Sequence, residues 1–297
     1  MDKEDMIRRI AQDPGFIAAL DQSGGSTPNT LKSYGINEAA YTNEEEMFQK
    51  IHEMRARIIK SPAFTGTHVL GAILFERTME GQIDGIPTAR FLWETSRIVP
   101  FLKVDKGMED EADGVQILKA MPELDSLLDR GLSNGIFGTK MRSVIKAVSE
   151  TGISRVVDQQ FEIAMEILAK GLVPIIEPEI TISMPDKDDA EGLLCEAILT
   201  HLDRLDTSHK VMLKLTLPET ANRYKVLADH PQVLRMVALS GGYDRATANA
   251  KLAQNTNMIA SFSRALTEGL SIHQSPSDFD ALLSTAVQSI YDASCAT

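Results

Sequence analysis

The chain has 297 residues, 43% of them hydrophobic, two cysteines and a formal net charge of -12, and this length suits one large domain or two small ones. The acidic charge argues against a nucleic-acid-binding protein, because such proteins neutralise phosphate groups with lysine and arginine. The distant cysteines form no metal-binding spacing, no apolar run reaches the ~20 residues that span a bilayer, and the N-terminal residues contain no export signal, so we expect a cytoplasmic protein with no membrane partner.

Short apolar runs alternate with longer helix-like stretches along the whole chain. Two of the helix-like stretches are 156–170 and 190–205, and in the first the residues that share one apolar face are Val157, Phe161, Ala164, Met165 and Leu168. Apolar runs of about five residues with little alternation are typical of strands buried on both faces of a parallel sheet. These runs are residues 16–20, 69–75, 98–104, 135–139, 172–177, 210–215, 234–239 and 257–261.

Eight such strands, each followed by a helix, predict an α/β fold of the (β/α)8 barrel type. We expect one barrel domain over residues 1–297, with short helical extensions at both ends. An open, doubly wound parallel sheet is the alternative.

Polar side chains stand at the carboxyl ends of most of these runs, where barrel proteins place their functional groups. So many polar strand ends predict a shared pocket. The residues are Asp21, Lys103, Asp105, Lys140, Arg142, Glu177, Glu179, Lys214, Ser240, Gly241, Gly242 and Arg264.

Lys214 interrupts the apolar run Val-Met-Leu-Lys-Leu-Thr. A lysine in this position either extends its ammonium group to the barrel rim or remains buried. Burial close to another cation, for which Lys140 is a candidate, would favour the neutral amine. A neutral amine attacks carbonyl groups and forms a Schiff base. The lysine alone does not decide between these interpretations.

Glu177 and Glu179 flank Pro178. They either end the strand, since proline cannot donate a ladder hydrogen bond, or act as a proton shuttle and a partner for a lysine. Two neighbouring carboxylates separate their pKa values, which leaves one of them easier to protonate.

Two glycine-containing segments are candidate anion sites. Ser240-Gly241-Gly242 is either a tight turn or a phosphate-binding loop after the seventh strand, with Arg264 as its charged partner. The segment ALDQSGGSTPNTL contains Ser23 and Ser26, which either cap a helix or form a second anion site. Lys103 and Arg142 are either solvated charges or phosphate ligands. Two anion sites would suit a bisphosphate.

The six histidines show no metal-ligand grouping. We therefore expect neither a catalytic metal nor a cofactor.

The motifs ALDQSGGST, FLKVDKG, FGTKMR, GLVPIIEPEI, VMLKLTLP, VALSGGYD and SFSRAL together resemble class I fructose-bisphosphate aldolase in its shorter bacterial form, over residues 16–291. The resemblance implies that Lys214 is the Schiff-base lysine and that Glu177 shuttles protons during imine formation. It also implies that Glu179 partners a lysine, that Asp21 takes part in carbon–carbon cleavage and that Lys140 orients the reacting hydroxyl group.

The same resemblance implies two phosphate sites. One contains Lys103, Arg142, Ser23 and Ser26, and the other contains Ser240, Gly241, Gly242 and Arg264. The expected activity is reversible cleavage of fructose 1,6-bisphosphate, a phosphorylated sugar, by a chain that is able to form a homo-oligomer.

The sequence departs from the animal members of this family at several positions. Gln22 replaces a glutamate, Leu215 and Thr216 replace a Pro-Asn pair, and the long tail with a terminal tyrosine is absent, which leaves Tyr291 as the nearest counterpart. Two alternatives remain open. One is another Schiff-base lyase, of the transaldolase or deoxyribose-phosphate aldolase kind, and the other is a non-catalytic sugar-phosphate binder.

Overall fold

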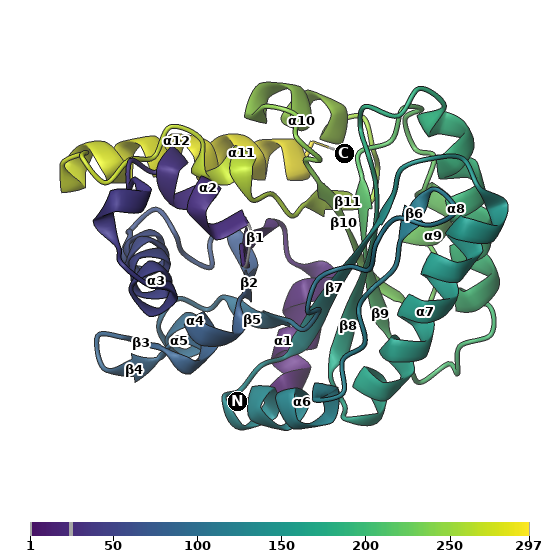
Figure 1. Cartoon of the computed structure of the whole chain (residues 1–297), viewed down its shortest axis with the longest axis horizontal. Coiled ribbons are helices and arrows are strands. Elements are labelled where there is room, and N and C mark those ends of the chain that lie inside the picture. Colours follow the sequence, from purple (N-terminus) through teal and green to yellow (C-terminus); the bar gives the residue numbers. More distant parts are fainter. Residues whose placement is uncertain (1, 24–25, 297) are drawn as a thin grey trace.

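The computed structural model describes residues 2–23 and 26–296. Among these residues, eight parallel strands form a nearly closed barrel in the order β1-β2-β5-β7-β8-β9-β10-β11 (Figure 1). The predicted (β/α)8 barrel is therefore confirmed, and the open sheet is excluded. The strands are β1 Phe16–Leu20, β2 Val69–Leu74, β5 Val99–Lys103, β7 Gly138–Ile145, β8 Val173–Ile180, β9 Val211–Thr216, β10 Val233–Leu239 and β11 Met258–Ala260.

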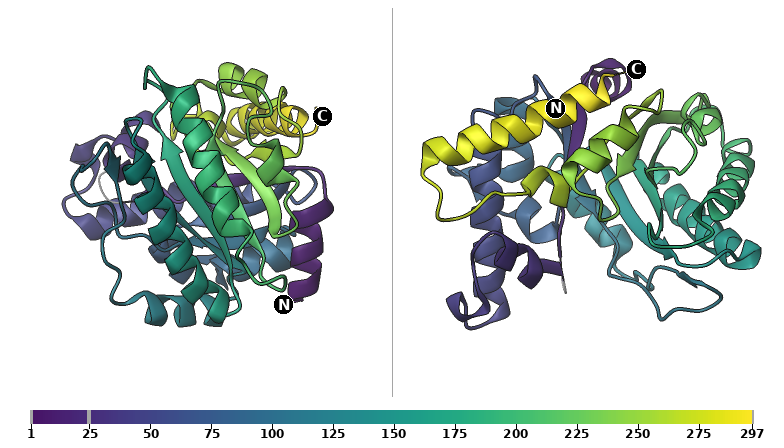
Figure 2. Two further views of the ribbon diagram at one scale, coloured as in Figure 1. Left: turned by 90° about the vertical axis from the view of Figure 1, so that its right-hand side faces the viewer. Right: turned by 90° about the horizontal axis from the view of Figure 1, so that it is seen from above.

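Helices cover the outside of the barrel. Figure 1 shows α7 and α8 along the outer side of β8 and β9, and Figure 2 shows α12 as a long helix on another side. None of the described helices is both long enough and apolar enough to cross a membrane. The helices are α1 Lys3–Gln12, α2 Thr27–Ser33, α3 Glu44–Lys60, α4 Glu76–Glu80, α5 Thr88–Arg90, α6 Leu124–Ser133, α7 Glu150–Ala169, α8 Lys187–Leu202, α9 Lys225–Ala228, α10 Arg245–Leu252, α11 Arg264–Thr267 and α12 Pro276–Ser294.

Shorter elements complete the fold. A small hairpin pairs β3 (Gln82–Ile83) with β4 (Ile86–Pro87), and β6 (Val115–Gln116) pairs antiparallel with β7. A short 3-10 helix spans Glu38–Ala40 and a π-helical turn spans Phe91–Thr95.

Several helices begin at a side chain that satisfies a free backbone N–H group of the first turn. In each case the oxygen of the capping residue accepts a hydrogen bond from a residue three positions later, as helix N-caps require. The capping residues are Asn43 for α3, Ser149 for α7, Asp244 for α10 and Ser275 for α12.

The barrel interior is apolar because alternate residues of each strand point inward. Ile17, Phe101, Ile175 and Met212 belong to this inner cluster. The helix α1 adds Met6 and Ile10 to the same cluster and so closes the end of the barrel where the strands begin. Any open pocket must therefore lie at the other end.

Two hydrogen bonds fix α1 to the base of the barrel. The guanidinium of Arg235, on β10, donates to the carbonyl oxygens of Ile10 at 2.7 Å and Asp13 at 2.8 Å. The helix is thus fixed at its carboxyl end, beneath the strand that precedes Ser240.

The barrel closes where its first and last strands meet. The Ala19 N–H group donates a hydrogen bond of 3.1 Å to the carbonyl oxygen of Phe262, just beyond β11. We call this junction the seam. It places the loop after β1 beside the loop after β11.

Two expected strand boundaries are wrong. The strand expected at 135–139 begins at Gly138 and continues to Ile145, and its neighbour continues through Pro178 to Ile180. The two strands stay in register from Gly138 opposite Val173 to Ile145 opposite Ile180. The charged residues that ended the apolar runs point into the barrel mouth, so they interrupt the hydrophobic pattern without interrupting the backbone pairing.

Met165 does not share the buried face of α7. Its side chain is 43% exposed, whereas Phe161 and Ala164 are buried. Adjacent residues on a helix are separated by about 100°, and this rotation carries Met165 out of the apolar face.

The packing at Gly138 generates a stability prediction. A methyl group at Gly138 would lie 2.3 Å from the Val173 carbonyl oxygen and 2.9 Å from the Phe101 ring, whereas a methyl group at Gly192 in α8 would meet nothing within 4 Å. We expect Gly138→Ala to lower the free energy of unfolding by about 1–3 kcal/mol through overpacking. Gly192→Ala should raise it by about 0.5–1 kcal/mol, because alanine favours the helix. Denaturant titration measures both, and equal effects would contradict this packing argument.

Candidate active site

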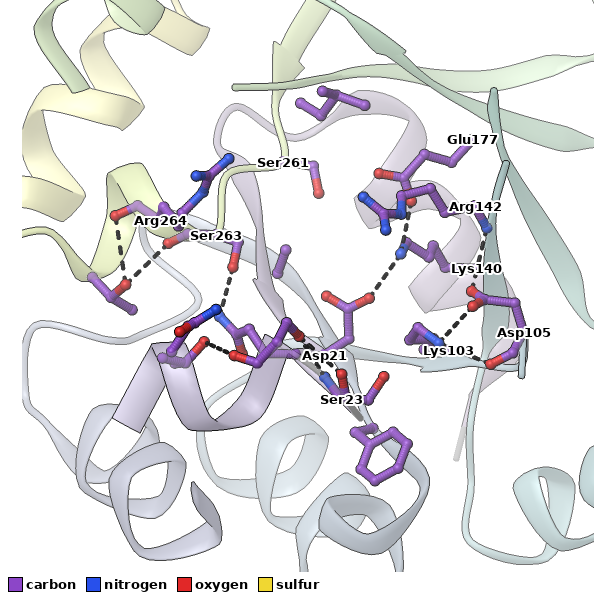
Figure 3. Close-up of a pocket in the computed structure, with 18 of the residues that line it drawn as sticks. Asp21, Ser23, Lys103, Asp105, Lys140, Arg142, Glu177, Ser261, Ser263 and Arg264 are labelled. Atoms are coloured by element: carbon purple, nitrogen blue, oxygen red, sulfur yellow. Dashed lines mark hydrogen bonds and ion pairs between the residues drawn. The ribbon is translucent and has the colours of Figure 1, made fainter. Parts of the chain in front are cut away.

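A cavity of about 930 Å³ opens at the carboxyl ends of the strands, opposite the end that α1 closes. Every predicted site residue except Gly242 lines it. Figure 3 shows side chains from both ends and both sides of this cavity pointing toward a common space. The predicted residues that line the cavity are Asp21, Ser23, Ser26, Lys103, Lys140, Arg142, Glu177, Glu179, Lys214, Ser240, Gly241 and Arg264.

Strand alternation explains why these side chains meet. Asp21, Glu177 and Lys214 each stand two residues after an apolar residue of the barrel interior, so they point the same way one layer higher. Ile176 pairs with Leu213 in the register of β8 and β9, which sets Glu177 and Lys214 side by side one residue further on. The apolar layer below therefore forms the floor of a charged layer.

Lys140 is the centre of that layer. Its Nζ lies 2.9 Å from Asp21 Oδ2 and 2.8 Å from Glu177 Oε2. The other oxygen of Glu177, Oε1, lies 3.1 Å from Lys214 Nζ. All four residues are buried, with at most 7% of each exposed. The result is a row of alternating charges, Asp21, Lys140, Glu177 and Lys214.

The two groups at one end of this row have strongly shifted pKa values. Burial would raise the pKa of Asp21, but the charges of Lys140, Lys214 and Lys103 hold it well below its ordinary value. Burial would lower the pKa of Lys140, but Asp21, Glu177 and Asp105 raise it well above its ordinary value. At neutral pH Asp21 is therefore a carboxylate and Lys140 an ammonium ion.

At one end of the cavity the cations already have carboxylate partners. Lys103 Nζ lies 2.6 Å from Asp105 Oδ1, and Arg142 Nη1 lies 2.9 Å from Glu179 Oε2. Burial would lower the pKa of Arg142, but Glu179, Glu177 and Asp105 raise it. The expected lysine partner of Glu179 is thus an arginine, because β7 already directs Lys140 toward Asp21 and Glu177.

At the opposite end, Arg264 begins α11 beside the loop after β10. Gly241 has φ +60°, and a methyl group there would lie 2.5 Å from Ile182 Cγ2, so both backbone and space require glycine. Gly242 has φ +120° and does not line the cavity. A methyl group there would lie 3.4 Å from Arg264 Nη2. In the described parts of the chain no carboxylate lies within ion-pair distance of Arg264.

Ser23 and Ser26 are hydrogen-bonded to each other at the cavity edge. The Ser23 N–H group donates to Ser26 Oγ at 3.1 Å, and Ser26 Oγ donates to the Ser23 carbonyl at 2.9 Å. Gly24 and Gly25, which the motif also contains, lie outside the described residues. Ser26 precedes α2 but its side chain makes no capping hydrogen bond, so its hydroxyl group bonds Ser23 rather than the helix.

The sequence reasoning missed three cavity residues on the seam side. Ser261 and Ser263 line the cavity, as does Gln22 from the loop after β1. Ser261 stands two residues after Ile259 of the barrel interior, so the same alternation that places Lys214 would have found it. The contact of Gln22 is across the seam and has no signal in the sequence.

Tyr291 lies away from the cavity. Its ring packs edge-on against His68 at 4.7 Å between centroids, and His68 stands just before β2, at the base of the barrel. The side chain therefore does not serve the charged layer in this conformation.

Potential metal ligands are dispersed. Over residues 2–23 and 26–296, no group of three or more histidine, cysteine, aspartate or glutamate side chains is arranged to hold a metal ion.

The fold and the site together define a class of protein. A buried lysine beside a carboxylate, at the carboxyl end of a (β/α)8 barrel, is the arrangement used by barrel lyases that act through a Schiff base. The family model described as fructose-bisphosphate aldolase class-I matches residues 4–222. This chain belongs to the class I fructose-bisphosphate aldolase family.

Individual relatives agree with this family assignment. The chain is 54% identical over 294 residues to the fructose-bisphosphate aldolase class 1 of Porphyromonas gingivalis, with 99% of each chain covered. It is 53% identical over 291 residues to that of Synechocystis sp., covering 98% of this chain and 97% of the relative. A fructose-bisphosphate aldolase of Plasmodium falciparum, solved with TRAP and a small-molecule inhibitor, shares the fold with a TM-score of 0.79 at 19% identity, over 98% of this chain and 94% of the other.

The position of Lys140 generates a prediction with a pH dependence. Lys140→Met leaves Asp21 buried without its direct partner, so the free energy of unfolding at neutral pH should fall by about 3–5 kcal/mol. The pKa of Asp21 should rise in this variant, because burial then loses the strongest of the charges that oppose it. In the native chain the low pKa of Asp21 stabilises the fold above about pH 4, and this contribution is lost as the pH falls through the folded-state pKa.

The difference in unfolding free energy between Lys140→Met and the native chain should therefore be largest near neutral pH and should shrink as the medium becomes acidic. Denaturant titration across this range measures it. The control is Lys106→Met, which removes a half-exposed cavity cation paired with Glu76 and should cost less than about 1 kcal/mol. A pH-independent loss for Lys140→Met would contradict the assigned charge states.

Proposed function

We propose that this chain cleaves fructose 1,6-bisphosphate reversibly to dihydroxyacetone phosphate and glyceraldehyde 3-phosphate through a Schiff base on Lys214. The metal-independent aldolase activity, which serves glycolysis and gluconeogenesis, is that of the family. The roles of individual residues are our assignment. The observation that carries it is the contact of Glu177 with Lys214 on one side and Lys140 on the other.

Imine formation uses Lys214 and Glu177. Glu177 first takes a proton from the Lys214 ammonium group, whose Nζ lies 3.1 Å from its Oε1, and the uncharged amine then attacks the C2 carbonyl as the electron pair of the C=O bond moves to oxygen. Glu177 returns that proton to the C2 oxygen to give a carbinolamine, and it then transfers a second proton from the nitrogen to the departing hydroxyl group. Water leaves, and a cationic imine remains.

Cleavage uses Asp21 and Lys140. The carboxylate of Asp21 accepts the proton of the C4 hydroxyl group, the C3–C4 bond breaks, and its electron pair moves into the imine to form an enamine. The low pKa of Asp21 keeps it ionised for this task. Lys140, 2.9 Å from Asp21, polarises the same C4 oxygen. Glyceraldehyde 3-phosphate leaves, and protonation and hydrolysis of the enamine release dihydroxyacetone phosphate.

The two ends of the cavity hold the two phosphates. Ser240, Gly241 and Arg264 form the site for the C1 phosphate, where the Arg264 guanidinium has no carboxylate partner among the described residues. Lys103 and Arg142, with Ser23 and Ser26 in the same cavity, form the site for the C6 phosphate. Gripping both ends places C2 near Lys214 and C4 near Asp21 before reaction, which removes part of the entropic barrier.

We further propose that residues 1–297 act as one catalytic domain with short helical extensions at both ends, that the protein is cytoplasmic and that it is able to form a homo-oligomer. The barrel spanning β1 to β11 supports the first statement, and the glycolytic role of the family supports the second. Size-exclusion chromatography with light scattering measures the third.

The Schiff base predicts a covalent adduct. Incubation with dihydroxyacetone phosphate and borohydride should reduce the imine and add the mass of one reduced triose phosphate at Lys214, which peptide mass spectrometry locates. Lys214→Met should show no adduct and should lose cleavage of fructose 1,6-bisphosphate by at least about 1,000-fold, because the electron sink is gone. An adduct on another lysine, or none in the native chain, would refute the assignment.

The two phosphate sites predict different substrate dependences. Arg264→Met should raise KM for both fructose 1,6-bisphosphate and fructose 1-phosphate by about 10- to 100-fold, the loss expected for one charged hydrogen bond. Lys103→Met should raise KM for the bisphosphate only. Steady-state kinetics with both sugars separates the two sites. Equal behaviour of the two variants with both substrates would contradict the assignment and favour a lyase that grips one phosphate.

A further inference from the structure

Arg55 is a buried cation outside the charged row. It lies on α3, and its side chain is 0% exposed. Its Nη1 donates to Thr78 Oγ1 at 2.7 Å, and its Nη2 donates to the main-chain carbonyl of Gln22. No described carboxylate within residues 2–23 and 26–296 lies at ion-pair distance from the guanidinium.

Keeping Arg55 charged in this buried position costs free energy. Burial lowers the pKa of Arg55 to about 10, and the negative charge of Asp21 opposes this lowering. The group is therefore protonated at neutral pH. A buried charge without an opposite charge beside it destabilises a fold, and an apolar residue of similar length in its place is often neutral or stabilising. Stability therefore does not explain why an arginine stands at position 55. The explanation lies in the contacts that Arg55 makes.

Gln22 connects Arg55 to Ser263 on the other side of the seam. Its Oε1 lies 3.4 Å from Arg55 Nη2, and its Nε2 donates to Ser263 Oγ at 2.5 Å. Ser263 immediately precedes Arg264, and Gln22 immediately follows Asp21. Figure 3 shows the bond to Ser263 between the loop that carries Asp21 and the loop that carries Arg264.

We propose that Arg55 and Gln22 are positioning residues that hold Asp21 and Arg264 at a fixed separation across the seam. The inference rests on the proposed function, in which Asp21 accepts the C4 proton and Arg264 binds the C1 phosphate. The substrate spans these two groups, so their separation decides whether the C4 hydroxyl group reaches the carboxylate. A misplacement of about 1 Å costs on the order of 100-fold in rate.

An amide at position 22 suits this arrangement. Its oxygen accepts from Arg55 while its nitrogen donates to Ser263, and it adds no charge beside Asp21. A carboxylate would attract Arg55 more strongly, but it would place a second negative charge next to Asp21 and oppose ionisation there.

The test separates imine formation from carbon–carbon cleavage. Trapping of dihydroxyacetone phosphate by borohydride uses Lys214 and Glu177 but not Asp21. Arg55→Met and Gln22→Ala should each lower kcat for cleavage of fructose 1,6-bisphosphate by about 10- to 100-fold, while the trapping rate at saturating dihydroxyacetone phosphate stays within about twofold of the native rate. The double variant should lose no more than the worse single variant, because contacting residues that act as one unit are not additive.

The control is Lys60→Met on the same helix, which removes an exposed ion pair with Asp84 and should leave both rates unchanged. Gln22→Ala alters a half-buried loop side chain and carries the test if Arg55→Met fails to fold. The proposal is overturned by unchanged cleavage, by additive losses in the double variant, or by cleavage and trapping that fall together with the melting temperature. Absence of trapping in the native chain would overturn the proposed function as well.

Discussion

The structure depends on a single ammonium group placed between two carboxylates at the nearly buried floor of the cavity. Lys140 neutralises Asp21 and Glu177 at once, and Glu177 in turn faces Lys214. Each of these ions would be costly to bury alone. Together they form a charged layer that is stable only as a set, and the apolar layer beneath it keeps the charges from being solvated from below. The same electrostatic balance that permits burial also keeps Asp21 ionised.

The two ends of the cavity differ in how their cations are paired. Lys103 and Arg142 each have an internal carboxylate, so an incoming anion must compete with Asp105 and Glu179. Arg264, at the opposite end, has no such competitor among the described residues. The barrel thus offers one immediately available anion site and one that is masked, with the reactive row between them.

Much of the fold and the site is readable from the sequence. Uninterrupted apolar runs mark strands covered on both faces, and a polar residue two positions after an inward apolar residue marks the barrel mouth, as for Lys214 after Met212. The length of β7 was missed because inward charges such as Arg142 look like the end of an apolar run. The partner of Glu179 was missed because register between strands, rather than spacing within one, decides which cation it meets. The contact between Arg55 and Gln22 joins residues 33 apart and leaves no local pattern.

The seam has a consequence for how the protein is made. The loop carrying Asp21 is translated well before Arg264, its counterpart across the junction. Pairing over this distance is costly in chain entropy and slow to form. A nascent chain therefore has no working pocket until translation has passed Arg264, and release before that point yields a product that still lacks one wall of the substrate site.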